Sequence, residues 1–139
     1  MTIAHERYRK YLETLTIETL PSLSSYVCPN VQFKDPFNDV SGVSAMTRIF
    51  QDMFENLGNT DFRVDQMASD ENVCLMAWQF QATLRGKPWK FLGTSVITFA
   101  PDGMVEKHID YWDSASDFYK HFPFIGWLLE KLKCRVAVH

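Results

Sequence analysis

The sequence predicts an α+β fold in which a strongly curved antiparallel sheet wraps around N-terminal helices as a cone, with a C-terminal helical tail. Apolar side chains recur at helical spacing in two segments before residue 58. After residue 61 the apolar period becomes two, with turn residues between the runs, as in an antiparallel meander. With 139 residues, of which 46% are hydrophobic, the chain can bury a sizeable core, and residues 1–139 are expected to form a single domain.

Two helices and a short strand are predicted in the first part of the chain. The helices cover residues 5–20 and 42–57, and the strand covers residues 30–34. Pro21 is expected to end the first helix, and Ser41 to cap the second. The apolar faces consist of Tyr8, Tyr11, Leu12 and Leu15 in the first helix, and of Val43, Met46, Ile49, Phe50, Met53, Phe54 and Leu57 in the second.

Four long strands are predicted next, at residues 62–68, 73–84, 89–99 and 104–112. The outward face of this sheet is unusually apolar, because it carries Val73, Leu75, Ala77, Leu92, Val96 and Thr98. A sheet face that meets water is normally polar. We therefore expect a homodimer that covers this face with a second copy of the sheet.

The C-terminal part begins as a helix at residues 113–117, where short polar residues and acids suit a helix start. A very apolar segment follows, with Phe118, Tyr119, Phe122, Phe124, Ile125, Trp127, Leu128 and Leu129. It is compatible with a lid across the mouth of the cone, a dimer contact or a membrane-surface helix. Glu130 dilutes the basic face that a membrane helix needs, which favours the lid or the dimer contact.

Composition excludes several classes of function. The net charge is −3 without a basic stripe, which argues against nucleic acid as a partner. No apolar run is long enough for a membrane span, and the first residues lack the apolar core of a signal peptide. Cys28, Cys74 and Cys134 lie far apart, against a disulfide framework and against zinc. We expect a cytoplasmic protein that needs neither metal nor cofactor.

The last predicted strand carries a candidate site. Side chains alternate along a strand, so Glu106, His108, Asp110 and Trp112 should share one face. If that face lines the cone, its ionisable groups are costly unless they are paired or used. An imidazole and a carboxylate two residues apart can couple for general acid–base catalysis. The alternative is a polar strip whose groups only bond to one another in a mostly dry pocket.

Aromatic residues would form the wall of the cone. Alternation places Trp78, Phe80 and Phe91 on the inner face together with Trp112, and Phe54 reaches it from the second helix. For each of these residues taken singly, an ordinary core position is the better explanation. Together they would bury a flat apolar molecule well, so we expect them to contact the substrate.

The order of these segments resembles the nuclear transport factor 2-like superfamily, whose fold is cystatin-like, and within it the SnoaL-like and ketosteroid isomerase-like proteins. The resemblance covers nearly the whole chain. It rests on Val31-Gln32-Phe33-Lys34-Asp35-Pro36, the helix at 42–57, and Val96-Ile97-Thr98-Phe99 followed by Asp102-Gly103 and the run at 108–113. This fold hosts many unrelated functions, so the resemblance is more specific for the fold than for the activity.

The resemblance implies roles for individual residues. Ketosteroid isomerases carry a general-base aspartate in an Asp-Pro pair, which Asp35 matches, and an oxyanion-binding tyrosine on the first helix, which Tyr11 matches. Their second oxyanion donor is an aspartic acid, but this chain has Ser95 there, a weaker proton donor that argues against strict steroid isomerisation. Asp110 is similar in placement to the acid–base aspartate of SnoaL-like cyclases. From the residues alone, local turn hydrogen bonds are the favoured main role of Asp35, and they are compatible with a role in the site.

Two functional interpretations remain open. In the first, the protein is an acid–base isomerase, cyclase, dehydratase or hydrolase acting on a small apolar or polycyclic molecule in the cone. Asp35 or Asp110 then exchanges a proton, and Tyr11, His108 or Ser95 polarises an oxygen. In the second, it is a non-catalytic module of the same fold that binds a ligand or another protein.

Overall fold

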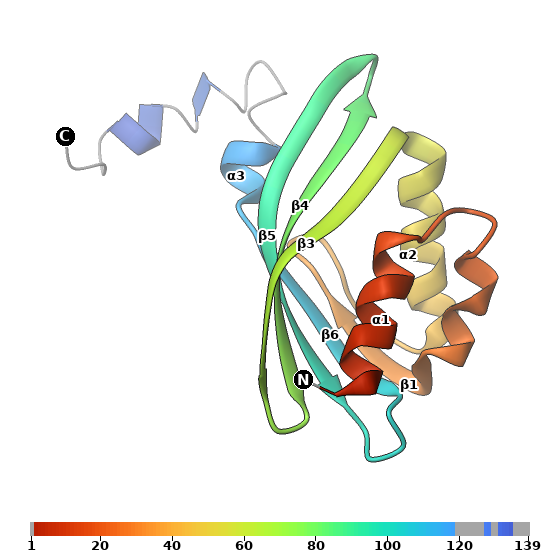
Figure 1. Cartoon of the computed structure of the whole chain (residues 1–139). Coiled ribbons are helices and arrows are strands. Elements are labelled where there is room, and N and C mark those ends of the chain that lie inside the picture. The colour runs from red at the N-terminus through yellow and green to blue at the C-terminus, as the bar shows by residue number, and fades with distance from the viewer. Residues whose placement is uncertain (1, 119–126, 129–130, 135–139) are drawn as a thin grey trace.

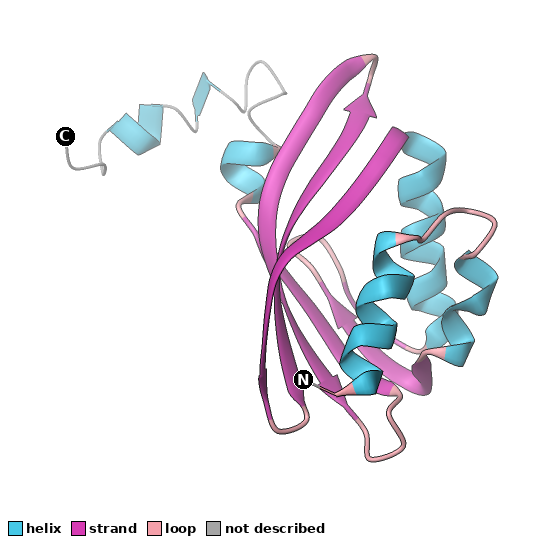
Figure 2. Cartoon of the chain, viewed as in Figure 1, coloured by secondary structure: helices cyan, strands magenta, loops and turns pink. Residues whose placement is uncertain are grey.

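The computed structural model describes residues 2–118, 127–128 and 131–134 (Figure 2). Its elements are α1 (Ile3–Glu13), a 3-10 helix η1 (Leu20–Ser25), β1 (Val27–Lys34), β2 (Asp39–Ser41), α2 (Val43–Asn56), β3 (Gly58–Asp70), β4 (Val73–Leu84), β5 (Lys87–Phe99), β6 (Val105–Trp112) and α3 (Ser114–Asp117). The strands β4 and β5 follow the period-two pattern closely, and β4 has the predicted bounds.

The strands form one six-stranded sheet in the order β2-β1-β6-β5-β4-β3. Neighbouring strands are antiparallel except for β1 and β6, which run parallel. The sheet is strongly twisted, and α1, η1 and α2 lie on the same side of it (Figure 1). The predicted α+β fold is therefore confirmed. The parallel pairing of β1 with β6 makes the sheet mixed, and a pairing so distant in sequence leaves no local pattern to predict it.

The core lies between the helices and the inner face of the sheet. Tyr8 and Leu12 of α1, Phe33 of β1, Met46 of α2 and Ile97 of β5 are all buried there. These residues come from the apolar faces that helical and strand periodicity predict. The core thus fixes α1 and α2 against the strands that carry the candidate site.

Both main helices have boundaries that differ from the prediction. α1 ends at Glu13 because the threonines that follow bind backbone groups themselves: Thr14 Oγ1 donates to the Lys10 carbonyl at 2.8 Å, and Thr19 Oγ1 accepts from the Thr16 amide at 2.8 Å. α2 is preceded by Gly42, not by a capping Ser41. Gly42 has a φ of 100°, which a side chain would make unfavourable.

A β-bulge interrupts β6. Val105 pairs with Phe99, whereas Lys107 pairs with Thr98, so β6 contains one extra residue at this point. As a result Val105 and His108 are both buried, and Glu106 is exposed. The prediction that Glu106 shares a face with His108 is therefore wrong, because the bulge resets the alternation between them.

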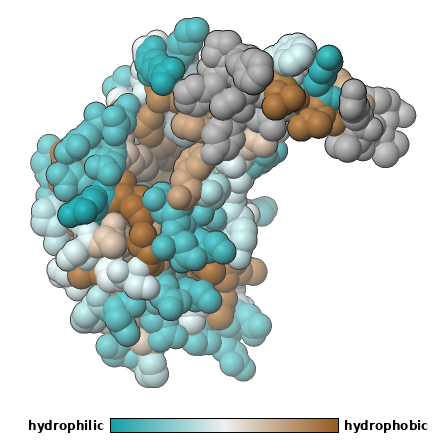
Figure 3. Space-filling model, turned by 180° about the vertical axis from the view of Figure 1, so that it is seen from behind, coloured by the Kyte–Doolittle hydropathy of each residue, from teal (hydrophilic) through white to brown (hydrophobic). Residues whose placement is uncertain are grey.

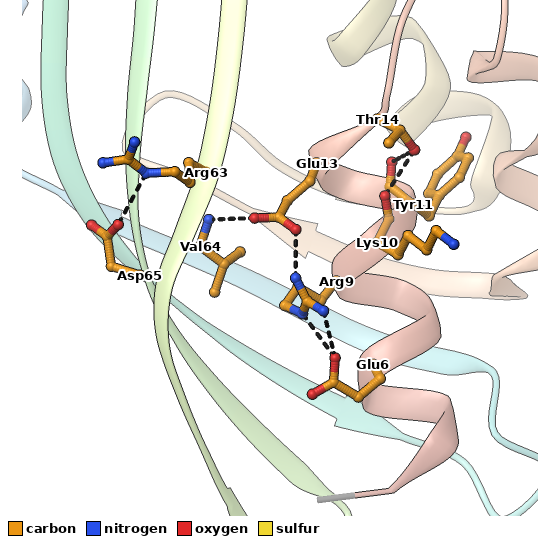
Figure 4. A network of polar contacts seen from close by, with 9 residues as sticks. All are labelled: Glu6, Arg9, Lys10, Tyr11, Glu13, Thr14, Arg63, Val64 and Asp65. Carbon is orange, nitrogen blue, oxygen red and sulfur yellow. Dashed lines mark hydrogen bonds and ion pairs between the residues drawn. The ribbon is translucent and has the colours of Figure 1, made fainter.

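A network of ion pairs and hydrogen bonds joins α1 to the edge strand β3 (Figure 4). Glu13 accepts a hydrogen bond from the Val64 amide at 2.9 Å through Oε2, and one from Arg9 at 2.6 Å through Oε1. Arg9 also bonds Glu6 at 2.7 Å. Glu13 thereby satisfies a backbone donor next to the β3 bulge between Val64 and Gln66.

Replacing Glu13 by alanine is expected to lower the free energy of unfolding by about 1–2 kcal/mol, because the Val64 amide loses its acceptor. Glu6→Ala is the matched control, since it removes a carboxylate from the same Arg9 at a half-exposed surface position, where an ion pair contributes about 0–1 kcal/mol. Urea denaturation of the two variants measures the difference. Equal losses would show that the bond to Val64 does not hold α1 on β3.

His5 of α1 is a buried histidine outside the candidate site. It is 2% exposed, packs on Phe99 with ring centroids 4.5 Å apart, and its Nδ1 atom has no hydrogen-bond partner among the described residues. Burial disfavours the charged imidazolium and lowers the pKa of His5 from its usual 6.5.

Stability is therefore expected to fall in mild acid. Because the folded state binds the His5 proton less readily than the unfolded state, this contribution to stability is complete above pH 6.5 and decreases as the pH falls below it. Urea denaturation between pH 7.5 and about 5 measures the slope, and His5→Leu should reduce it. An unchanged slope in His5→Leu would assign the acid sensitivity to other groups.

Candidate active site

Five side chains from four elements form a continuous row of hydrogen bonds across the inner face of the sheet. Trp78 Nε1 lies 2.8 Å from Ser95 Oγ, and Ser95 Oγ lies 2.5 Å from Asp110 Oδ1. The same Asp110 oxygen lies 2.7 Å from His108 Nε2, and His108 Nδ1 lies 2.8 Å from the Tyr8 hydroxyl. We call Trp78, Ser95, Asp110, His108 and Tyr8 the polar row.

The sheet register positions most of the polar row. Ser95 of β5 pairs directly with Asp110 of β6, and the next inward pair along these strands joins Ile97 to His108. Side chains of directly opposed residues lie close together on one face of a sheet. The row is thus built by strand pairing, and only Tyr8 reaches it from a helix.

The inner end of the polar row is deeply buried. Tyr8 is 1% exposed and His108 is 2% exposed. Burial raises the pKa of Tyr8 well above 10, and the negative charge of Asp110 acts in the same direction, so Tyr8 is a neutral phenol. The Tyr8 hydroxyl can therefore donate to His108 Nδ1, and His108 Nε2–H can then donate to Asp110.

Asp110 is the member of the polar row that is open to a ligand. Its side chain is 18% exposed, compared with 3% for His108. Oδ1 contacts both Ser95 and His108, while Oδ2 has no hydrogen-bond partner within the described part of the chain. One oxygen is thus anchored, and the other is available for chemistry.

Asp110 lines a hollow of about 420 Å³ where β1 leaves the edge of β6, which we call the edge hollow. Its lining residues are Lys34, Asp35, Pro36, Ile109, Asp110, Tyr111 and Trp112. The structure therefore brings the two predicted carboxylates, Asp35 and Asp110, to one opening.

Asp35 also makes the local turn bonds that its position before a proline predicts. Its Oδ1 accepts hydrogen bonds from the backbone amides of Phe37 at 2.8 Å and Asn38 at 2.7 Å. Burial nevertheless raises the pKa of Asp35; the turn amides oppose this rise, and Asp110 adds to it. Asp35 is thus the carboxyl group of the edge hollow that binds a proton more readily than usual.

Four of the aromatic residues predicted to form the wall pack on one another, because Trp78, Phe80 and Trp112 all contact Phe91. Of these four, only Trp112 lines the edge hollow. Trp78, Phe80 and Phe91 are buried, and Trp112 is half-buried and stacks on Phe91 with centroids 4.3 Å apart. Phe54 of α2 is half-buried and packs against the core. Seen from behind, the molecule shows hydrophobic surface in a furrow between hydrophilic flanks (Figure 3).

Tyr11 does not occupy the place expected for it. Its hydroxyl donates to the carbonyls of Thr19 and Leu20, at 3.1 and 3.3 Å, and its ring stacks on Tyr26. Burial raises the pKa of Tyr11 to about 12. Tyr8, one turn earlier on the same apolar face, contacts His108 instead. Helical spacing favours the two tyrosines equally, and only the inward position of His108, next to the bulge in β6, distinguishes them.

The start of the C-terminal region touches the aromatic wall. Phe118 packs on Trp89 of β5 and on Phe37, with centroid distances of 5.8 and 5.0 Å, and the Trp89 indole donates to the Asp117 carbonyl. Trp127 and Leu128 are exposed. The rest of the predicted apolar tail, with Tyr119, Phe122, Phe124, Ile125 and Leu129, lies outside the described residues.

Neither a membrane-spanning helix nor a cluster of metal ligands is found among the described residues. No helix in residues 2–118, 127–128 and 131–134 is long and apolar enough to cross a membrane. The same residues contain no group of three or more histidine, cysteine, aspartate or glutamate side chains placed to hold a metal ion.

Comparisons with known proteins agree with this architecture. The sequence model of the SnoaL-like domain matches residues 8–108. No curated protein sequence matches the chain. Among solved structures, an NTF2-like protein of unknown function from Burkholderia pseudomallei is similar with a TM-score of 0.74 at 14% identity, over 83% of this chain and 94% of that one.

Two further structures carry more information. An LEH-like epoxide hydrolase from Mycobacterium tuberculosis is similar with a TM-score of 0.67 at 15% identity, over 97% of this chain and 93% of that one. A Catenulispora acidiphila protein with a ketosteroid isomerase-like fold, in complex with trimethylamine, has a TM-score of 0.70 at 8% identity, over 84% and 90%. At these identities the similarity establishes the fold alone.

Proposed function

Because the chain belongs to the SnoaL-like domain family, we propose that it is an acid–base enzyme that needs no cofactor and acts on a small apolar or polycyclic molecule, with Asp110 exchanging the proton. The observation that carries this proposal is the asymmetric environment of Asp110. One oxygen is held by Ser95 and His108, the other has no hydrogen-bond partner among the described residues, and Asp110 lines a hollow. A held carboxylate with one free oxygen is well placed for general acid–base catalysis.

Asp35 supplies the complementary group. Its raised pKa suits it to donate a proton while Asp110 accepts one, and a pair of carboxyl groups in unlike environments is a common basis for such a division of roles. Isomerisation, cyclisation, dehydration and epoxide hydrolysis all need one proton removed and one delivered. Epoxide hydrolysis has the additional support that the M. tuberculosis protein of the same fold is named for it.

The aromatic wall supports an apolar substrate. Trp112 lines the edge hollow and stacks on Phe91, so a flat molecule that enters beside Asp110 meets aromatic faces first. Ser95 and His108 hold the carboxylate from behind. Tyr8, buried behind His108, acts only through that histidine.

The proposal is tested with a panel of small epoxides, β,γ-unsaturated ketones, secondary alcohols and polycyclic ketones. Binding is followed by thermal shift and conversion by mass spectrometry, for the wild type and for Asp110→Asn. Conversion of at least one class by the wild type, with binding retained but conversion lost in the variant, supports the enzyme. Binding without conversion in both proteins supports the alternative, a ligand-binding module.

We also infer that the protein forms a homodimer through the outer face of the sheet. Leu75, Leu92 and Tyr111 are 41%, 64% and 57% exposed on this face. Exposed apolar side chains grouped on one sheet commonly mark an interface. Sedimentation velocity should show a dimer that Leu92→Glu converts to a monomer; a monomeric wild type would contradict this.

A further inference from the structure

The six-membered ring of the Trp78 indole packs closely against Gly93, its direct partner on β5. A Cβ atom placed on Gly93 would lie 2.4 Å from two carbons of the Trp78 ring, which is closer than real atoms approach. Glycine inside a strand often marks such a close approach. The position of the indole therefore depends on the absence of a side chain at residue 93.

The packing of Trp78 on Gly93 directs the indole nitrogen along β5 toward Ser95. Trp78 Nε1 reaches Ser95, two residues beyond Gly93, at 2.8 Å, and Ser95 is 1% exposed. An indole N–H can only donate, so the Ser95 oxygen accepts this bond. The single hydroxyl hydrogen of Ser95 is then directed to Oδ1 of Asp110, at 2.5 Å. A donor that is itself polarised by a second donor forms a stronger hydrogen bond.

We propose that Trp78, seated on Gly93, is a positioning residue that orients the Ser95 hydroxyl toward Oδ1 of Asp110 and thereby reserves Oδ2 for the proton exchanged with a substrate. The second half of this statement rests on the proposed function, whereas the orientation of Ser95 does not. His108 reinforces the arrangement by bonding the same oxygen from the other side.

The test is the pH titration of the Asp110 carboxyl carbon by NMR in selectively labelled protein. Trp78→Phe keeps an aromatic ring but removes the N–H, and it is expected to move the titration midpoint to higher pH because Ser95 donates less strongly to the carboxylate. Ser95→Ala should move it in the same direction. If Trp78 acts through Ser95, the double variant should move it no further than Ser95→Ala alone.

Trp89→Phe is the matched control, because the Trp89 indole packs on Phe91, as that of Trp78 does, but donates to the Asp117 carbonyl. It is expected to leave the Asp110 midpoint unchanged. Gly93→Ala should reproduce Trp78→Phe by displacing the indole; if this variant does not fold, the Trp78 and Ser95 series decides the question by itself.

An unchanged midpoint in Trp78→Phe, or shifts that simply add in the double variant, would overturn the proposal. The result is independent of turnover. If the midpoints move as expected while Asp110→Asn converts every substrate as the wild type does, the orienting role of Trp78 stands and the proposed catalytic function is the part that fails.

Discussion

Replacing Asp110 by asparagine is expected to lower kcat by about 10²–10⁴-fold, the usual contribution of a general acid–base group. The substitution keeps the shape of the side chain, and the amide oxygen can still accept hydrogen bonds from Ser95 and His108. The fold and ligand affinity should therefore remain, while the group that takes up the proton is lost. Single-turnover kinetics and calorimetric binding on the same substrate separate the two effects.

Asp61→Asn is the matched control for this experiment. Asp61 is an exposed residue of β3 and undergoes the same chemical change away from the polar row. It should leave kcat unchanged. If Asp110→Asn also leaves kcat unchanged, Asp110 is not the catalytic acid or base, and the ligand-binding interpretation becomes the better one.

Replacing His108 by leucine is expected to lower the free energy of unfolding by about 2–4 kcal/mol, because two buried hydrogen-bonding partners are affected at once. Leucine would leave the buried Tyr8 hydroxyl without its partner and would remove one of the two contacts to Asp110. The loss is limited because the Asp110 side chain is 18% exposed and can bind water in place of the imidazole. Urea denaturation at neutral pH measures the loss.

Tyr8→Phe separates the two consequences of losing His108. It removes only the hydroxyl and should cost about 1–2 kcal/mol. In the double variant of Tyr8→Phe with His108→Leu, no buried hydroxyl is left without a hydrogen-bond partner. The combined loss of stability should therefore be smaller than the sum of the single losses. Additive losses would mean that the bond between Tyr8 and His108 contributes nothing to stability.

Much of the fold can be predicted from periodicity because strands β4 and β5 obey it over long runs. The bounds of β4 and the inner positions of His108 and Asp110 follow from alternation alone. The bulge at Glu106 does not, since an inserted residue changes the register without changing the composition of the strand. α1 ends earlier than predicted for another local reason, because the threonine side chains that follow it compete for backbone groups.

The candidate site is also only partly predictable from sequence, because several of its contacts join residues of different helices and strands. Asp35, Asp110 and Trp112 meet at the edge hollow as their positions suggested. Which of the two tyrosines contacts His108 depends on how far each lies along the sheet, and helical spacing does not encode this distance. The dependence of Trp78 on Gly93 is a contact between two strands, so neither residue indicates it alone.

The parallel pairing of β1 with β6 also bears on how the molecule is made. Tyr8 and His108 are 100 residues apart in sequence, and their bond closes only after β1 has docked beside β6. Contacts this distant are entropically expensive to form and slow folding. We expect the hairpins of β3 to β6 to form first and the N-terminal segment to add last. A nascent chain that still lacks β6 has neither the parallel partner of β1 nor His108 and Asp110, so the site can form only after β6 has been made.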